Sequence, residues 1–157
     1  MEQMPMQFPE WTRVAEVELI YKTKVKASER PKISCSTDAY KLFLEYWDKD
    51  KLEFVEEFKV MLLNRTHKVL GICNLSSGSV SETVADPKLV FMTALKANAS
   101  YIMVAHNHPS GNLKPGRADE ALTLKIAEGG KFLELRLLDH LIITQEGYYS
   151  FADEGLI

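Results

Sequence analysis

Two histidines separated by one residue open a proline- and glycine-rich stretch, His106-Asn107-His108-Pro109-Ser110-Gly111. Side chains alternate along a strand, so histidines at positions i and i+2 at a strand end can point the same way. Two converging imidazoles suit Zn²⁺, which binds nitrogen ligands at about 2.0–2.1 Å. Asp119, expected in the first turn of the next helix, can add a carboxylate oxygen. We therefore expect one zinc ion per chain on His106, His108 and Asp119, with water as the fourth ligand.

A hydrolytic metal site also needs a base that accepts the proton of the attacking water. Glu56 and Glu57 stand at the start of an expected strand. Alternation places Glu56 on the face of Phe58 and Val60, whereas Glu57 shares a face with Lys59, which we expect to be exposed. A carboxylate that points inward is costly unless it has a function. Glu56 is therefore the expected catalytic base, with Glu57 as the alternative if the strand is bulged.

Each of these residues also has a simpler interpretation. The histidines could be polar loop residues, Glu56 a solvated residue before a strand, and Asp119 an acidic residue that the helix dipole favours at an N-terminus. The four residues together favour the metal site over these alternatives. His140 lies in an apolar run, and we expect a hydrogen-bonded core residue there rather than a ligand.

Periodicity and turn residues predict the elements that hold this site. We expect an irregular lead-in over residues 1–13 and one domain over residues 14–157. The expected elements are a strand over 14–25, a helix from Ser36 or Thr37 to Asp48, a hairpin of strands 54–63 and 68–75, a helix begun by Asp86-Pro87, a strand over 101–105, a helix over 118–128 ended by Gly129-Gly130, and strands over 133–144 and 148–151. This order predicts an α/β layer fold around one mixed sheet.

Charge argues against direct binding of DNA. The formal net charge is −3 and the pI is about 5.8, whereas a protein that grips duplex DNA normally has a basic face. Lys22, Lys24 and Lys26 cluster, but Glu16 and Glu18 precede them, so a mixed-sign solvated strand face is the preferred interpretation.

The number of cysteines and the length of the apolar runs indicate in which cellular compartment the protein is expected. The chain has 2 cysteines, Cys35 and Cys73, and no CxxC pair, which argues against a disulfide framework. No apolar run reaches the roughly 20 residues that span a bilayer, and the N-terminus lacks the layout of a signal peptide. We expect a cytoplasmic protein with no membrane contact.

The residues around the histidine pair also resemble a known family. Residues 105–111, with Pro115 and Asp119, resemble the RadC family, a branch of the JAB/MPN (JAMM) metalloprotease-like domains. The likeness extends over most of the chain, with further similar stretches at 28–31, 138–140 and 148–152.

The JAMM pattern is an upstream glutamate, then His-x-His, seven residues, serine, two residues and aspartate. Glu56, His106, His108 and Asp119 match it. The resemblance implies a three-layer, cytidine-deaminase-like fold, zinc on the last three residues and a water polarised by Glu56. It further implies hydrolysis of a peptide or isopeptide bond in a peptide or protein substrate.

The sequence departs from the JAMM pattern at two positions. Asn107, between the histidines, is usual for RadC-like proteins, whereas deubiquitinating relatives have Ser or Thr. Gly116 stands where the family has the serine that stabilises the oxyanion of the tetrahedral intermediate. Loss of one such donor costs on the order of 10²–10³ in rate; Ser110 or the backbone N–H of Gly116 could substitute.

These departures leave two rival functions open. One is a catalytically weak or inactive zinc-binding accessory module in DNA repair or recombination. RadC proteins commonly carry a helix-hairpin-helix region before the JAB domain, but only a short lead-in precedes it here, so the family's DNA repair label transfers only as a name. The other is a structural zinc closed by a fourth protein ligand, His140 or a cysteine.

Overall fold

The computed structural model describes residues 14–18, 20–78 and 85–157. The lead-in predicted for residues 1–13 lies outside this range. Within it the helices are α1 (Ser36–Glu45), α2 (Lys49–Leu52), α3 (Pro87–Lys96) and α4 (Arg117–Phe132), and Ala27–Glu29 form a short 3-10 helix. The strands are β1 (Glu57–Leu63), β2 (Val69–Ser77), β3 (Tyr101–Asn107), β4 (Arg136–Ile143) and β5 (Tyr148–Ser150).

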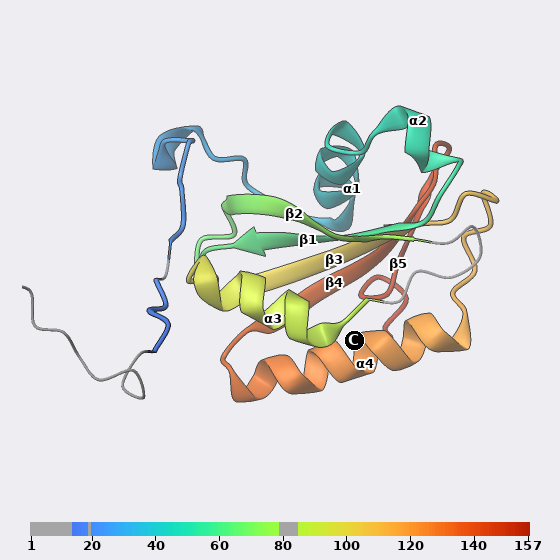
Figure 1. The fold of residues 1–157 in the computed structure, drawn as a ribbon. Helices are drawn as coiled ribbons and strands as arrows, with labels where there is room; N and C mark the ends of the chain where they lie inside the picture. The colour runs from blue at the N-terminus through green and yellow to red at the C-terminus, as the bar shows by residue number, and fades with distance from the viewer. Residues whose placement is uncertain (1–13, 19, 79–84) are drawn as a thin grey trace, which may run out of the picture.

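The strands form one mixed sheet with helices on both faces (Figure 1), which confirms the expected α/β class. The strand order is β2-β1-β3-β4-β5, so β3 is central, as its apolar run predicted. Strands β3 and β4 are parallel, and the other neighbouring pairs are antiparallel. Parallel neighbours need a crossover connection, here α4, which returns the chain from the end of β3 to the start of β4.

Two apolar clusters, one on each side of the sheet, hold the layers together. Phe43 and Trp47 of the α1 region pack with Met61 and Met103 of the strands. On the other side, α3 and α4 pack on a cluster that includes Phe58. Strand β1 is therefore buried on both faces, including all of its residues from Glu57 to Leu63.

Two local signals in the sequence are confirmed. Helix α3 begins at Pro87, and the side chain of Asp86 accepts a hydrogen bond from the N–H of Lys88, as an N-cap does. Strands β1 and β2 form the predicted hairpin, in which the Asn64 side chain accepts bonds from the N–H groups of Thr66 and Lys68.

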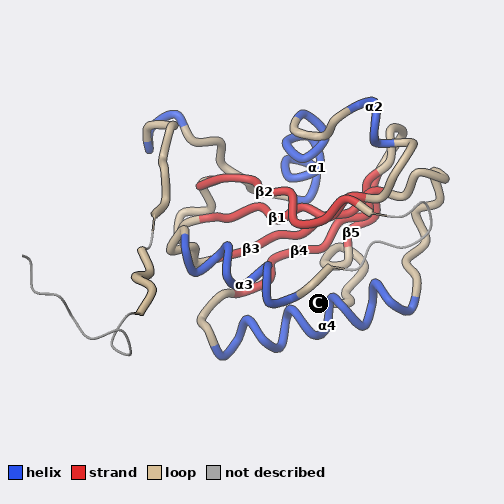
Figure 2. Tube along the Cα trace, in the orientation of Figure 1, coloured by secondary structure: helices blue, strands red, loops and turns tan. Residues whose placement is uncertain are grey.

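The prediction of a strand over residues 14–25 is wrong. Residues 14–18 and 20–25 form no strand and are exposed, and Figure 2 draws them as loop beside the body of the protein. The alternation of apolar and charged residues is present, but a strand needs a partner and a buried face. Among these residues, Tyr21 contacts the sheet by donating its hydroxyl to the Leu70 carbonyl, at 2.6 Å, on the edge strand β2.

The prediction that Gly129-Gly130 ends the last helix is also wrong, because α4 continues to Phe132. Both glycines serve close packing. A Cβ on Gly130 would lie 2.1 Å from the Leu135 carbonyl oxygen, and one on Gly129 would lie 2.9 Å from the Phe91 ring. The helix ends at Phe132, and the backbone turns two residues later at Glu134, which has a φ of 54°.

No helix within the described residues is both long and apolar enough to cross a membrane.

Candidate metal centre

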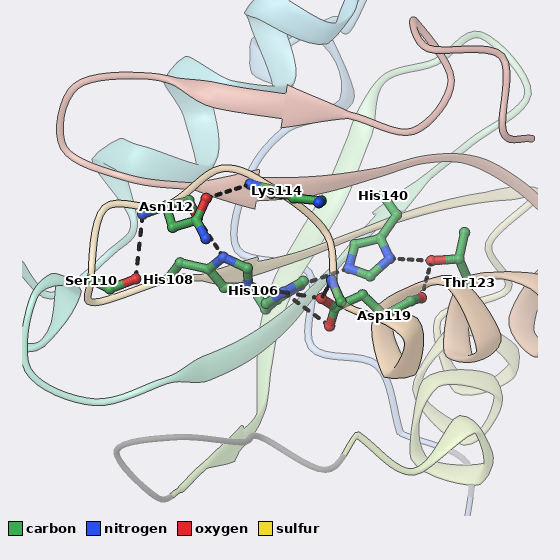
Figure 3. Close-up of polar contacts among 9 residues, drawn as sticks. His106, His108, Ser110, Asn112, Lys114, Asp119, Thr123 and His140 are labelled. Carbon is green, nitrogen blue, oxygen red and sulfur yellow. Dashed lines mark hydrogen bonds and ion pairs between the residues drawn. The ribbon is translucent and has the colours of Figure 1, made fainter.

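His106, His108 and Asp119 lie together at the carboxyl end of β3 (Figure 3), with one donor atom of each within 4.8 Å of the others. The two Nε2 atoms are 3.0 Å apart. One carboxylate oxygen of Asp119, Oδ1, lies 3.3 Å from His106 Nε2, and the other, Oδ2, lies 3.8 Å from His108 Nε2. Two imidazole nitrogens and a carboxylate oxygen at this spacing form a donor set that fits a divalent transition metal.

The fold fixes each donor through a short piece of backbone. His106 is the penultimate residue of β3, and the N–H of His108 continues the ladder by donating to the Ile143 carbonyl at 3.1 Å. Asp119 is the third residue of α4, and its Oδ2 accepts a hydrogen bond from the N–H of Gly116, the N-cap residue, at 2.7 Å. That bond holds the Asp119 carboxylate at the start of α4.

Both histidines have a hydrogen-bond partner on the nitrogen that faces away from the cluster. His108 Nδ1 lies 2.5 Å from the Asn112 carbonyl oxygen, and His106 Nδ1 lies 2.8 Å from His140 Nε2. A carbonyl can only accept, so His108 Nδ1 carries the proton and its Nε2 presents a lone pair to the cluster. Partners of this kind orient metal-binding histidines.

His140 is confirmed as a hydrogen-bonded core residue. It is 0% exposed, stacks on Phe151 at 4.7 Å between ring centroids, and meets Phe58 edge-on at 5.8 Å. Its Nδ1 lies 2.6 Å from the Thr123 hydroxyl. Because its Nε2 contacts the outward nitrogen of His106, His140 is not part of the metal-binding group of the described residues.

Burial favours the neutral form of two of these imidazoles, those of His106 and His140. Burial lowers the pKa of His106 to about 4; the charge of Asp119 opposes this shift, and His108 adds to it. Burial also lowers the pKa of His140 well below its ordinary value, with smaller contributions from His106 and His108. A metal ion binds the neutral form of imidazole. His106, His108 and Asp119 therefore fit the metal ion that the sequence predicts.

The two glutamates at the start of β1 lie on different sides of the sheet. Glu56 immediately precedes β1, is half-buried, and lines the cleft that His108 and Asp119 also line. Glu57 is 1% exposed and pairs with Lys59, whose Nζ lies 3.3 Å from its carboxylate and 4.7 Å from the centre of the Trp47 ring. The expectation that Lys59 is exposed is wrong, because this ion pair and the Trp47 ring cover it.

Asn107, between the two histidines, holds the chain on both sides of Glu56. Its amide nitrogen donates to the carbonyls of Leu52 and Val55 at 2.7 and 2.8 Å, and its side-chain oxygen accepts from the N–H of Glu57 at 2.7 Å. The residue is 0% exposed. These bonds tie the turn that carries Glu56 to the end of β3, between the two histidines.

The metal-binding group opens into a cleft of about 630 Å³. Part of its wall is apolar, formed by residues just before and at the start of α3 and by residues of α4, and two lysines also line it: Ala85, Pro87, Ala118, Ala121, Leu122, Lys114 and Lys125. Ser110 lies on its rim, exposed, and its hydroxyl accepts a bond from the N–H of Asn112 at 3.3 Å. A larger surface hollow at the other end of the sheet contains none of these histidines or carboxylates.

The two expected substitutes for the motif serine were the Ser110 hydroxyl and the backbone N–H of Gly116. Of these two, only the Ser110 hydroxyl can still donate a hydrogen bond to a substrate. The N–H of Gly116 is already donated to Asp119. Gly116 therefore holds the Asp119 carboxylate in place at the N-cap position of α4.

Sequence reasoning missed the contributions of Thr123, Asn112 and the Asn107 side chain. Thr123 follows Asp119 by four residues, and residues four apart share a helix face, so a signal for Thr123 was available. The roles of Asn107 and Asn112 depend on backbone carbonyls brought close by the fold, for which the sequence carries no local signal.

Comparison with known proteins agrees with this geometry. A family model described as RadC-like JAB domain matches residues 33–156. A UPF0758 protein of Flavobacterium johnsoniae is 46% identical over 101 residues, which cover 64% of this chain and 44% of that protein. A UPF0758 protein of Porphyromonas gingivalis is 48% identical over 103 residues, covering 65% and 45% of the two chains.

A more distant relative, UPF0758 protein STH371 of Symbiobacterium thermophilum, is 37% identical over 103 residues, covering 66% of this chain and 44% of that protein. The chain thus spans less than half the length of the curated relatives it matches. With the family model covering residues 33–156, and with the sheet, the two histidines and the aspartate in place, this chain belongs to the RadC-like JAB domain family.

Proposed function

We propose that this domain is a zinc-dependent hydrolase of peptide or isopeptide bonds. The observation that carries the proposal is the convergence of His106, His108 and Asp119 at the edge of a cleft that Glu56 also lines. A donor set of two histidines and one carboxylate leaves a coordination position for water, which catalytic zinc sites need. When bound, zinc lowers the pKa of water toward about 7 and acts as a Lewis acid on a carbonyl.

The residues of the chain would then divide the proton transfers between them. Glu56 accepts a proton from the attacking water, whose oxygen bonds to the scissile carbonyl carbon, and passes it to the leaving amine as the C–N bond breaks. Ser110 is the hydroxyl on the cleft rim that can donate to the carbonyl oxygen as it gains negative charge. The backbone bonds of Asn107 keep the Glu56 turn in register with the histidines.

The second candidate is a zinc-binding accessory module without turnover, in processes linked to DNA repair or recombination. The engaged N–H of Gly116 favours it, since the residue at the motif serine position supplies neither a hydroxyl nor its own backbone N–H. The net charge of −3 supports a link to DNA through another protein rather than through direct contact.

We also propose that the domain works in the cytoplasm. Cys35 and Cys73 are both free, and a reducing compartment keeps thiols in that state.

Metal content is the first test. Protein purified without a metal-affinity column is expected to hold close to one zinc per chain, and the double variant His106→Ala/His108→Ala is expected to hold none. Reconstitution in parallel with Fe²⁺ and Mn²⁺ distinguishes zinc from other metals that accept this donor set. Wild-type protein that takes up no metal after reconstitution would overturn both candidate functions.

Turnover is the second test, with a peptide and isopeptide library and zinc-loaded protein. Glu56→Gln is expected to abolish cleavage and to leave zinc content unchanged, while Glu53→Gln, at an exposed position on the same turn, is the matched control and should cleave like wild type. Full zinc loading with no cleavage by any form would favour the accessory module.

A further inference from the structure

A chain of hydrogen bonds runs from His106 through His140 and Thr123 to the backbone of Asp119, so it connects two of the metal ligands behind the site (Figure 3). It joins His106 Nδ1 to His140 Nε2 at 2.8 Å, His140 Nδ1 to the Thr123 hydroxyl at 2.6 Å, and that hydroxyl to the Asp119 carbonyl at 2.6 Å. His140 and Thr123 are 0% and 2% exposed, so water does not compete for these bonds.

The bond between the Thr123 hydroxyl and the Asp119 carbonyl determines which atom is the donor in each of the other bonds of the chain. The carbonyl of Asp119 can only accept, so the single proton of the Thr123 hydroxyl points toward it. The hydroxyl oxygen must then accept from His140, whose Nδ1 carries a proton. His140 sits between the rings of Phe58 and Phe151, where a charged imidazolium is unfavourable, so its Nε2 is an acceptor.

It follows that His106 donates from Nδ1 and has a bare lone pair on Nε2, the atom that faces His108 and Asp119. The opposite tautomer would place a proton on Nε2 and block the metal. We propose that His140 and Thr123 are a positioning pair, which locks His106 in its metal-binding tautomer and ties it to the backbone of the carboxylate ligand. This inference rests on the metal site of the proposed function and not on turnover.

The pair is tested through zinc affinity, measured by competition with a chromophoric chelator. Thr123→Val removes the hydroxyl and keeps the shape, and it is expected to weaken zinc binding by about 10–100-fold, the usual effect of losing a partner behind a ligand. Thr123→Ser restores the hydroxyl and should bind within about threefold of wild type. His140→Leu should weaken binding at least as much, and His140→Gln, whose amide offers one donor and one acceptor, should recover part of the loss.

Helix α3 provides a matched control. Thr93 donates its hydroxyl to the Leu89 carbonyl at 2.8 Å, the same bond to the residue four positions earlier that Thr123 makes, away from the metal ligands. Thr93→Val should therefore leave zinc affinity unchanged. Thermal unfolding of each protein without metal separates a loss of zinc affinity from a loss of folding.

Imidazole ¹⁵N NMR of the metal-free protein gives a readout that a merely structural role would not move. We expect His106 in the Nδ1–H form in wild type and a mixture of tautomers in Thr123→Val. Zinc affinity of Thr123→Val equal to that of Thr93→Val would overturn the proposal, as would an Nε2–H His106 in wild type or a wild-type protein that binds no zinc. A zinc affinity that responds as expected, in a protein that cleaves nothing, supports the positioning pair and counts against the hydrolase.

Discussion

The side-chain oxygen of Asn107 accepts a hydrogen bond from the backbone N–H of Glu57 at 2.7 Å, and the two residues are 0% and 1% exposed. This bond joins the last residue of β3, which lies between the two histidines, to the first residue of β1, directly after Glu56. Together with the bonds to Leu52 and Val55, it makes the position of the expected base depend on Asn107, the residue between the two histidines.

Asn107→Ala is therefore expected to damage the Glu56 turn more than the metal-binding group. It leaves two carbonyls and one N–H without a partner, and a buried group in that state costs about 1–3 kcal/mol, so we expect a loss of about 3 kcal/mol in urea unfolding. Amide exchange of residues 52–57 should accelerate, while zinc content stays near that of wild type.

Asn107→Asp sharpens this test. It keeps the oxygen that accepts from Glu57 but cannot donate to the two carbonyls, so it should also destabilise the turn. An Asn107→Asp protein as stable as wild type, with slow exchange at residues 52–57, would show that these bonds do not hold the turn.

Asp119 has two separable roles, because Oδ1 lies nearer His106 and Oδ2 caps α4 through Gly116. Asp119→Asn keeps an oxygen for the N–H of Gly116, so the metal-free protein should unfold within about 0.5 kcal/mol of wild type, while zinc affinity falls by at least tenfold. Asp119→Ala should lose both the affinity and about 1 kcal/mol of stability, the usual cost of losing such a bond at a helix start. Equal stabilities of the two metal-free variants, measured in urea, would contradict this division.

Gly116→Ser restores the hydroxyl of the JAMM pattern. The backbone φ of −84° suits any residue, but the new Cβ would lie 3.3 Å from Asp119 Oδ2, so that carboxylate must shift by a few tenths of an ångström. Serine is a slightly better cap than glycine, so stability should change by no more than about 0.5 kcal/mol. If the domain is a hydrolase, the added donor should raise the rate by up to about 10²-fold at constant zinc content.

Gly71→Ser is the matched control for that variant, since a Cβ at Gly71 meets nothing within 4 Å. It should change neither zinc content nor rate. Equal rates for Gly116→Ser and Gly71→Ser on a substrate that the wild type cleaves would show that the missing serine does not limit the reaction.

Asp139 makes stability depend on pH. Burial raises the pKa of its carboxyl; the bonds it accepts from Ser150, Ala152 and His140 oppose the shift, and the charge of Asp153 adds to it. The folded protein thus holds this proton more tightly than the unfolded chain. Its contribution to stability is full below the ordinary pKa of 3.8 and is lost as the pH rises through the raised value.

Asp139→Asn has no proton to lose. The difference in unfolding free energy between wild type and this variant should therefore shift against wild type as the pH rises through that window and then level off. Urea unfolding in a pH series measures it. A difference that is flat with pH, or that moves in favour of wild type, would contradict a raised pKa.

The metal-binding group could be predicted because it depends on local signals. Spacing i and i+2 at a strand end brought His106 and His108 together, and the start of α4 brought Asp119 to them. The N-cap of α3 followed in the same way from Asp86-Pro87.

The errors arose where a distant partner decides the outcome. A lysine in a strand is usually exposed, so the sequence alone predicts an exposed Lys59. Its burial is tolerated because the fold packs the Trp47 ring and the Glu57 carboxylate against it. Alternation over residues 14–25 describes two faces but does not say whether a neighbouring strand exists. A pair of glycines such as Gly129 and Gly130 is typical of a helix end. Here the pair lies inside α4, because the Phe91 ring and the Leu135 carbonyl leave no room for a Cβ at these positions.

The close contact at Gly130 has a consequence for engineering and for inherited variation. Helix α4 is a stiff rod, and Gly130 lies roughly 16 Å along its axis from Asp119, at about 1.5 Å per residue. A side chain at Gly130 would push the C-terminal end of α4 away from the Leu135 carbonyl. Because the helix is stiff, its N-terminal end would shift as well and move the Asp119 carboxylate out of place. A loss of metal binding would therefore not have to come from a change in the metal-binding group, and substitutions at the far end of α4 should have effects similar to substitutions of His106, His108 or Asp119.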